Sequence, residues 1–148
     1  MARTIVLKGN GNFLEGKLTA VAVPPGTLME RVPGASTFRA QSVSEGAGVL
    51  PEKLIAIENS LIGDEVGDNW ASESRIKMYK AQSSDVVHLR LEDSEVITSG
   101  DVLTPNGTNG TVKKRDTSTN PGFAYALEDK DALSDSASDD LLVKAVII

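Results

Sequence analysis

Two glutamates end short apolar runs at corresponding places in the chain, and together they could form a catalytic pair of carboxylates. Glu58 follows Leu-Ile-Ala-Ile, and Glu128 follows Phe-Ala-Tyr-Ala-Leu. General acid–base chemistry needs two such groups facing one cleft, among other polar groups. No polar cluster accompanies either glutamate, so the sequence favours structural acids that bond to backbone amides or to a nearby cation.

The other residues that could perform chemistry are few. The chain has one histidine, His88, and no cysteine. Disulfides and thiolate metal sites are therefore excluded, and a triad or a histidine metal site has almost nothing to draw on. His88 and Arg90 lie in an alternating stretch, where we expect both side chains to face outward. We predict no catalytic residue, no metal site and no cofactor, and so not an enzyme.

Three further segments have simple structural interpretations. Residues 129–140 hold five aspartates, but they lack the ligand spacing and the glycine of a calcium loop, so we expect a solvated loop or one short helix. Residues 9–11 and 45–48 lack the glycine spacing and the lysine of phosphate-binding loops. The basic run at 113–115 is expected to be ordinary solvated surface.

Composition limits the class of protein. The chain has 148 residues, 40% of them hydrophobic and 24% charged, with a net charge of −6. This fits one soluble domain and argues against nucleic acid or an anionic membrane as the main partner. The N-terminal apolar run is too short for a signal peptide, and no stretch approaches the roughly 20 apolar residues that span a bilayer.

Short apolar or alternating stretches separated by turn residues run through the whole chain, without a sustained helical period. Such a pattern predicts an all-β fold, a small β-barrel or sandwich of about nine or ten short strands with long loops and little helix. Residues 54–58 fit helix or strand by period alone, and their short length favours strand. We expect strands at 4–7, 18–23, 28–32, 37–40, 54–58, 75–80, 86–91, 96–97 and 141–148, besides those of 99–129.

Residues 99–129 show the clearest local organisation: strand, Asn-Gly turn, strand, loop, strand. The turn is placed at 106–107 or at 109–110, because both residue types tolerate the positive φ that tight hairpins need. The structural turn residues are predicted to be Gly26, Gly100, Asn106, Gly107 and Gly110.

A fainter copy of this layout lies upstream. Aligning the two pairs Gly26 with Gly100, Thr37 with Thr111, Pro51 with Pro121, and residues 56–58 with 126–128. Few positions are identical, so the pattern allows two half-repeats without establishing a duplication.

The order of short motifs resembles the small head-decoration, or cement, proteins of tailed bacteriophages. The motifs lie at residues 25–32, 54–59, 76–79, 84–90, 97–103, 110–112 and 123–129, followed by a β-rich tail. The resemblance covers about residues 20–148, and the chain departs from it at Trp70 and the longer segment 59–74.

This resemblance implies a β-tulip-like, catalytically silent protein on the outer surface of a phage head, made in the host cytoplasm. Its implied partners are the major capsid protein and itself, as a homotrimer. We expect an N-terminal strand or arm at 1–20 and one decoration domain at 21–148. The β-branched N-terminal run predicts capsid contacts at Ala2, Arg3, Thr4, Ile5, Val6, Leu7 and Lys8. The apolar C-terminal strand predicts a subunit interface at Val143, Ala145 and Ile147.

Other classes of protein stay open. A tail-tube or minor capsid subunit would also be β-rich and self-assembling. A stand-alone β-barrel binding module would show exposed aromatic residues in a groove, and an enzyme fragment would need a polar cluster.

Overall fold

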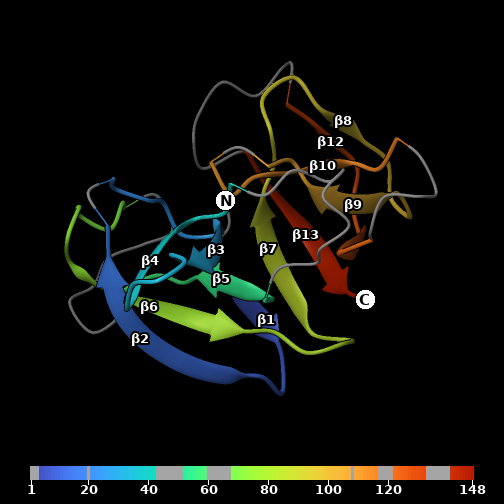
Figure 1. Cartoon of the computed structure of the whole chain (residues 1–148). Helices are drawn as coiled ribbons and strands as arrows, with labels where there is room; N and C mark the ends of the chain where they lie inside the picture. Colours follow the sequence, from blue (N-terminus) through green and yellow to red (C-terminus); the bar gives the residue numbers. More distant parts are fainter. Residues whose placement is uncertain are drawn as a thin grey trace.

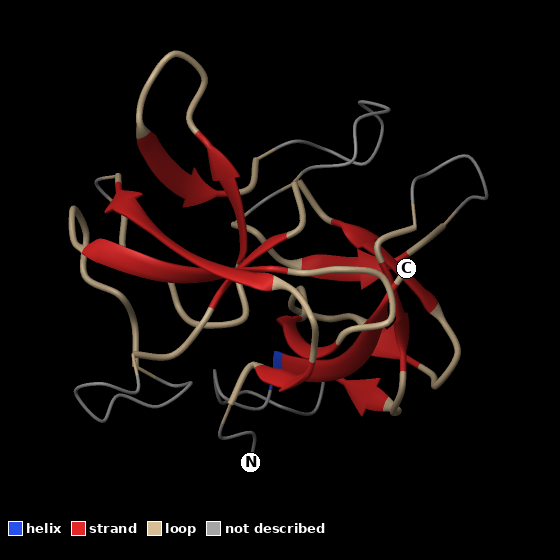
Figure 2. Ribbon diagram, turned by 90° about the horizontal axis from the view of Figure 1, so that it is seen from below, coloured by secondary structure: helices blue, strands red, loops and turns tan. Residues whose placement is uncertain are grey.

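The structure is a computed structural model of the chain, and it describes residues 4–19, 21–42, 52–59, 68–107, 109–116, 122–132 and 141–148. Its thirteen named elements are β-strands (Figure 1), and Figure 2 shows only one very short helical segment besides them, which confirms the predicted all-β class with little helix. They are β1 (Val6–Lys8), β2 (Asn12–Leu18), β3 (Leu28–Arg31), β4 (Thr37–Ala40), β5 (Leu54–Ala56), β6 (Arg75–Lys80), β7 (Val86–Arg90), β8 (Val96–Ile97), β9 (Val102–Pro105), β10 (Val112–Lys114), β11 (Ala124–Ala126), β12 (Lys130–Asp131) and β13 (Leu142–Ile147).

The first half of the chain forms a small closed barrel with the strand order β2-β4-β3-β5-β6. Neighbouring strands are antiparallel except β2 and β4, whose parallel pairing at Leu18 and Phe38 closes the ring. Figure 1 shows this barrel beside the second half of the chain. Its interior is filled by apolar side chains: Leu18, Val23, Met29, Phe38, Leu54, Ala56, Trp70, Ile76 and Met78.

The second half repeats this strand pairing. Its main sheet has the order β1-β7-β13-β11-β9-β10, and a parallel bridge between Leu91 and Val112 brings the end of β7 to β10. The strands β7, β10, β9, β11 and β13 therefore occupy the places of β2, β4, β3, β5 and β6. The extra pair β8 and β12 corresponds to the isolated bridge between Val23 and Trp70 in the first half.

Backbone hydrogen bonds confirm the alignment of the two halves. Gly26 N donates to Ala56 O over 2.8 Å, and Gly100 N donates to Ala126 O over 2.8 Å. Both glycines have positive φ, +89° and +94°. The predicted pairing of Gly26 with Gly100 and of Ala56 with Ala126 therefore holds in three dimensions, whereas Pro51 and Pro121 lie outside the described residues.

The two β3–β4 and β9–β10 hairpins also correspond. Val32 N donates to Thr37 O over 2.9 Å, and Asn106 N donates to Thr111 O over 2.9 Å. In the second hairpin Gly107, Asn109 and Gly110 have positive φ, so both Asn-Gly pairs contribute to one longer turn, and Asn106 itself does not adopt positive φ.

One predicted strand is wrong. The strand expected at 18–23 lies earlier in the chain, as β2 at Asn12–Leu18. The chain therefore turns within residues 9–11 and then continues as an extended strand. Leu14, Gly16 and Leu18 face the barrel, and Gly16 hid this alternation in the sequence. A Cβ on Gly16 would lie 2.2 Å from the Phe38 ring, so the glycine makes room for that ring.

The second half has side chains of different sizes at the positions that correspond to Gly16 and Phe38. Leu89 takes the place of Gly16, because Leu89 pairs with Val143 as Gly16 pairs with Ile76. Val112 takes the place of Phe38 in the parallel closure. Two side chains of intermediate size therefore stand where the first half has a glycine and a large ring.

The two halves are joined at Gly110, in the tip of the β9–β10 hairpin. Leu28 N donates to Gly110 O over 2.8 Å, and Gly110 N donates to Gln41 O over 3.1 Å. Gly110 thus bonds to the ends of both β3 and β4 of the first barrel, which are also bonded to each other from Gln41 N to Leu28 O over 2.9 Å. A Cβ there would lie 2.3 Å from Leu28 O, and the φ of +67° also disfavours any side chain.

We predict that Gly110→Ala lowers the free energy of unfolding by about 2–4 kcal/mol, because the methyl group strains the φ and meets backbone atoms. Gly34→Ala is the matched control: its φ is +73° but nothing lies within 4 Å of the added Cβ. Gly34→Ala should cost only about 1 kcal/mol. Urea unfolding of the two variants measures the difference, and equal losses would contradict the inserted position of Gly110.

We also predict that Gly16→Ala costs about 1–3 kcal/mol through its clash with Phe38, and that Phe38→Val relieves this cost. The double variant carries a valine at position 38, as the second half does at the corresponding position, Val112. A double-mutant cycle by urea unfolding should show a favourable coupling of about 1 kcal/mol or more. Additive losses would show that the two positions do not share a packing site.

Candidate interaction surface

The two glutamates that could have formed a catalytic pair bond to backbone instead. Glu58 Oε2 accepts from Ile5 N over 3.1 Å, and its other oxygen accepts from the Thr4 hydroxyl. Glu128 Oε1 accepts from Lys144 N over 2.8 Å. The structural interpretation of both acids is confirmed: each fixes a neighbouring segment at the end of an apolar strand.

His88 and Arg90 also hold the fold together. His88 Nδ1 lies 2.8 Å from Thr4 O. Arg90, expected to face outward, is buried, and its Nη2 donates to Pro25 O over 2.9 Å. The outward prediction for Arg90 is wrong because the first half covers that face of β7. Val87 and Leu89, on the opposite face of the strand, are fully buried.

The basic run of the second half lies beside acids. Lys114 Nζ is 3.0 Å from Asp101 Oδ2, and Lys113 Nζ is 3.6 Å from Asp116 Oδ2. The predicted solvated surface holds only for Lys114, because Lys113 and Arg115 are half-buried. Both pairs are partly exposed ion pairs that add little to the free energy of unfolding.

Among the described residues, no group of three or more His, Asp or Glu side chains is placed to hold a metal ion. Most of the acidic segment, 133–140, lies outside the described residues. A shallow hollow of about 360 Å³ opens beside β8 and β12, lined by Val96, Ile97, Thr98, Asp129, Lys130 and Asp131.

Trp70, which the sequence left without a role, is a buried anchor of the first barrel. Its Nε1 donates to Ile57 O over 2.7 Å, and its backbone bridges to Val23. The indole therefore fills the core with its one polar atom satisfied.

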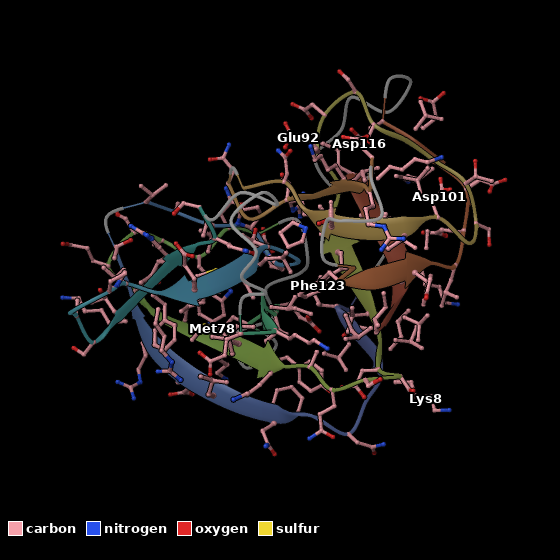
Figure 3. All side chains as sticks on the ribbon, turned by 45° about the vertical axis from the view of Figure 1, so that its right-hand side comes forward. Lys8, Met78, Glu92, Asp101, Asp116 and Phe123 are labelled. Atoms are coloured by element: carbon pink, nitrogen blue, oxygen red, sulfur yellow. The ribbon has the colours of Figure 1, made fainter. Side chains whose placement is uncertain are left out.

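The N-terminal segment lies against the rest of the chain. Ala2 and Arg3 are outside the described residues. Ile5 is fully buried, Leu7 is 42% exposed, and Lys8 points away from the molecule (Figure 3). β1 pairs with β7 and forms one edge of the main sheet, so its other side has no strand partner within that sheet. β2, in the same N-terminal range, is a wall strand of the first barrel.

A buried polar cluster fixes the turn between β1 and β2. Tyr79 Oη donates to Asp85 Oδ2 over 2.6 Å and accepts from Gly11 N over 2.7 Å. Asp85 also accepts from Gln82 N and Asn10 N, over 2.8 and 2.9 Å. Burial by itself raises the pKa of Asp85, but these hydrogen bonds outweigh it and hold that pKa below its usual value. Burial and the bond to Asp85 raise the pKa of Tyr79.

The three residues predicted to form a subunit interface lie inside the chain. Val143 and Ala145 are fully buried and Ile147 is 2% exposed, because β13 is an inner strand of the sheet and these side chains face the core. A buried side chain offers no surface to a second subunit, so the structure corrects this prediction.

The outer face of the same sheet carries apolar side chains that the sequence analysis missed. Tyr125 is 45% exposed, Leu127 42% and Ile148 37%, with Val102 and Val146 half-buried beside them. The signal was the alternation within residues 123–127, which places the small Ala124 and Ala126 inside and the large side chains outside. Such an inverted pattern is typical of a face that contacts another molecule.

No helix long and apolar enough to cross a membrane occurs in the part of the chain that the structure describes. Neither a protein-family model nor a curated protein matches the sequence. The fold is similar to that of a solved structure, the head fiber gp8.5 N base of bacteriophage phi29, with a TM-score of 0.56. The similarity covers 93% of this chain and 95% of that chain at 15% identity, which shows a shared fold.

We predict that the carboxylate of Asp85 makes stability dependent on pH. Because its folded pKa lies below the unfolded value near 3.8, its contribution is present above that pH and is lost as the pH falls through the folded pKa. Asp85→Asn should cost about 1–3 kcal/mol at neutral pH, since an amide cannot accept all of these bonds.

Urea unfolding at about pH 7 and about pH 3 measures how much the free energy of unfolding changes with pH. This change should be smaller in Asp85→Asn than in the native chain. Asp116→Asn is the control, because it removes the same charge from a side chain that is 69% exposed. The same pH dependence in the native chain and in Asp85→Asn would contradict the role of Asp85.

Proposed function

We propose that this protein is a non-enzymatic structural component of a phage virion that binds the outer surface of the capsid and stabilises it by bridging capsid subunits. The observation that carries the proposal is the fold similarity to a base of a phage head fiber over nearly the full length of both chains. The motif order that resembles head-decoration proteins supports the same assignment.

The site chemistry is compatible with a structural role. The described residues that could have performed catalysis, Glu58, Glu128 and His88, are committed to backbone contacts within the chain. Attachment to a capsid instead requires buried apolar area and strand addition at free sheet edges. Among the described residues, β1 is an edge strand of the main sheet, and the second half of the chain carries an apolar outer face.

β1 is the best-placed contact for capsid within the predicted N-terminal set. Leu7 is exposed on β1, an edge strand that pairs with β7 on one side. A capsid strand can therefore be added on the other side. The buried Ile5 anchors this edge and is not itself available for contact.

We predict saturable binding of the full chain to expanded phage heads that lack their outer proteins, at a simple ratio to the capsid protein. Co-sedimentation of purified protein with such heads measures the occupancy. No binding at any concentration tested would rule out the proposed function and direct the search to ligands of a free binding module.

Leu7→Glu should weaken this binding at least about tenfold, because a charge would enter the contact. Val21→Glu is the matched control, because Val21 is an apolar side chain that is 69% exposed and does not belong to β1. Equal occupancy of the heads by both variants would exclude β1 as the capsid contact.

A further inference from the structure

The indole ring of Trp70 fills a site in the first half that the second half leaves without a ring. Trp70 pairs with Val23 through two backbone hydrogen bonds, of 2.8 and 3.2 Å. Its side chain is 8% exposed, packs among the apolar residues of the first barrel, and donates from Nε1 to Ile57 O over 2.7 Å. The first half therefore closes this site with a flat ring that carries one hydrogen-bond donor.

In the second half a lysine stands at the position of this tryptophan. Val23 and Ile97 each lie three residues before the equivalent glycine of positive φ. Ile97 pairs with Lys130 in β8 and β12, as Val23 pairs with Trp70. The repeat thus replaces Trp70 by Lys130.

A hollow opens at this pair of the second half. Its volume is about 360 Å³, and both Ile97 and Lys130 line it. The described residues that line it all belong to the second half. Figure 1 shows β8 and β12 at the end of the second half that lies away from β2. The site that a ring fills in the first half is therefore accessible from outside in the second half.

The walls of the hollow suit an aromatic ring. Val96, which is 50% exposed, and Ile97 supply apolar surface for the face of a ring. Lys130 adds an ammonium group, and a cation within about 6 Å of a ring centre is attracted to the ring face. Trp is the side chain that this attraction favours most.

The acceptor of the indole N–H also has a counterpart. Leu127 N donates to Lys144 O as Ile57 N donates to Lys77 O, so Leu127 O corresponds to Ile57 O. Leu127 is 42% exposed, which leaves this region accessible to a molecule outside the chain. Two carboxylates line the hollow as further acceptors, those of residues 129 and 131.

We propose that the hollow beside β8 and β12 binds the indole ring of a tryptophan that a partner protein presents, in the place that Trp70 occupies in the first half. A shallow hollow holds one flat ring and leaves the rest of the ligand outside, which suits a side chain that projects from a protein. Tryptophan is also among the residues that contribute most to protein contacts. The site lies apart from β1 and does not depend on capsid binding.

Binding of N-acetyl-tryptophanamide to the full-length native chain tests the proposal. Ligand up to about 10 mM nearly saturates a site with a dissociation constant of about 1 mM. The NMR signals of the backbone amides of residues 96–98 and 129–131 should shift saturably. N-acetyl-leucinamide, which has no ring, should bind at least about fivefold more weakly.

Lys130→Trp supplies the ring from within the chain, so it should bind the amide at least about tenfold more weakly than the native chain. Lys130→Leu is the matched control, because it removes the same charge without adding a ring. It should bind the amide at most about fivefold more weakly than the native chain. The urea midpoint of Lys130→Trp should be at or above that of Lys130→Leu, because the added ring fills the hollow.

Three results would overturn the proposal. The first is a native chain whose signals at 96–98 and 129–131 do not shift saturably. The second is a Lys130→Trp variant that binds the amide as the native chain does, or that unfolds at lower urea than Lys130→Leu. The third is free tryptophan that binds at least about tenfold more tightly than the amide, which would assign the site to the amino acid instead of a protein side chain.

Discussion

The backbone of Gly110 is the closest point of contact between the two halves of this protein. This one residue bonds to both Leu28 and Gln41, in a space that admits no side chain. The ends of β3 and β4 also bond directly to each other, from Gln41 N to Leu28 O, so Gly110 supplies the bonds that this pair leaves open. The contact acts together with the bonds from Arg90 to Pro25 and Gly26, which hold β7 against the first half.

The two halves share strand pairing but fill their interiors differently. In the first barrel the Phe38 ring fills the space beside Gly16, and the second half carries Val112 and Leu89 at the corresponding positions. Cores tolerate such hydrophobic substitutions, so two halves with the same strand pairing can share few identical residues. The second half also places Ala124 and Ala126 inside, and its large side chains on the same strand lie outside, where a further molecule can bury them.

The polar residues that suggest chemistry instead form hydrogen bonds that hold separate segments of this fold together. Asp85 accepts from Tyr79 and from two backbone amides, and Glu58 holds the N-terminal segment. Buried polar groups of this kind are tolerated because their hydrogen bonds replace those to water. Short strands leave many backbone amides in turns without a backbone acceptor, so side chains from distant segments accept those hydrogen bonds. The polar side chains are used in this way to fix the turns, and the apolar outer face is available for association.

Much of this architecture could be predicted from the sequence because it depends on local chemistry. Turn residues, short alternating runs and the missing helical period determined an all-β fold, and the spacing of Gly26 and Gly100 located the two repeats. The surfaces could not be predicted in this way, since strand alternation distinguishes two faces but not which one another segment covers. Arg90 is buried because the first half packs against it, and Tyr79 is buried because the segment with Gly9, Gly11 and Phe13 lies against its ring. Val143 lies inside because β13 is an inner strand of the sheet. Burial depends on contacts between distant segments, so the tertiary structure alone decided which apolar face was left open.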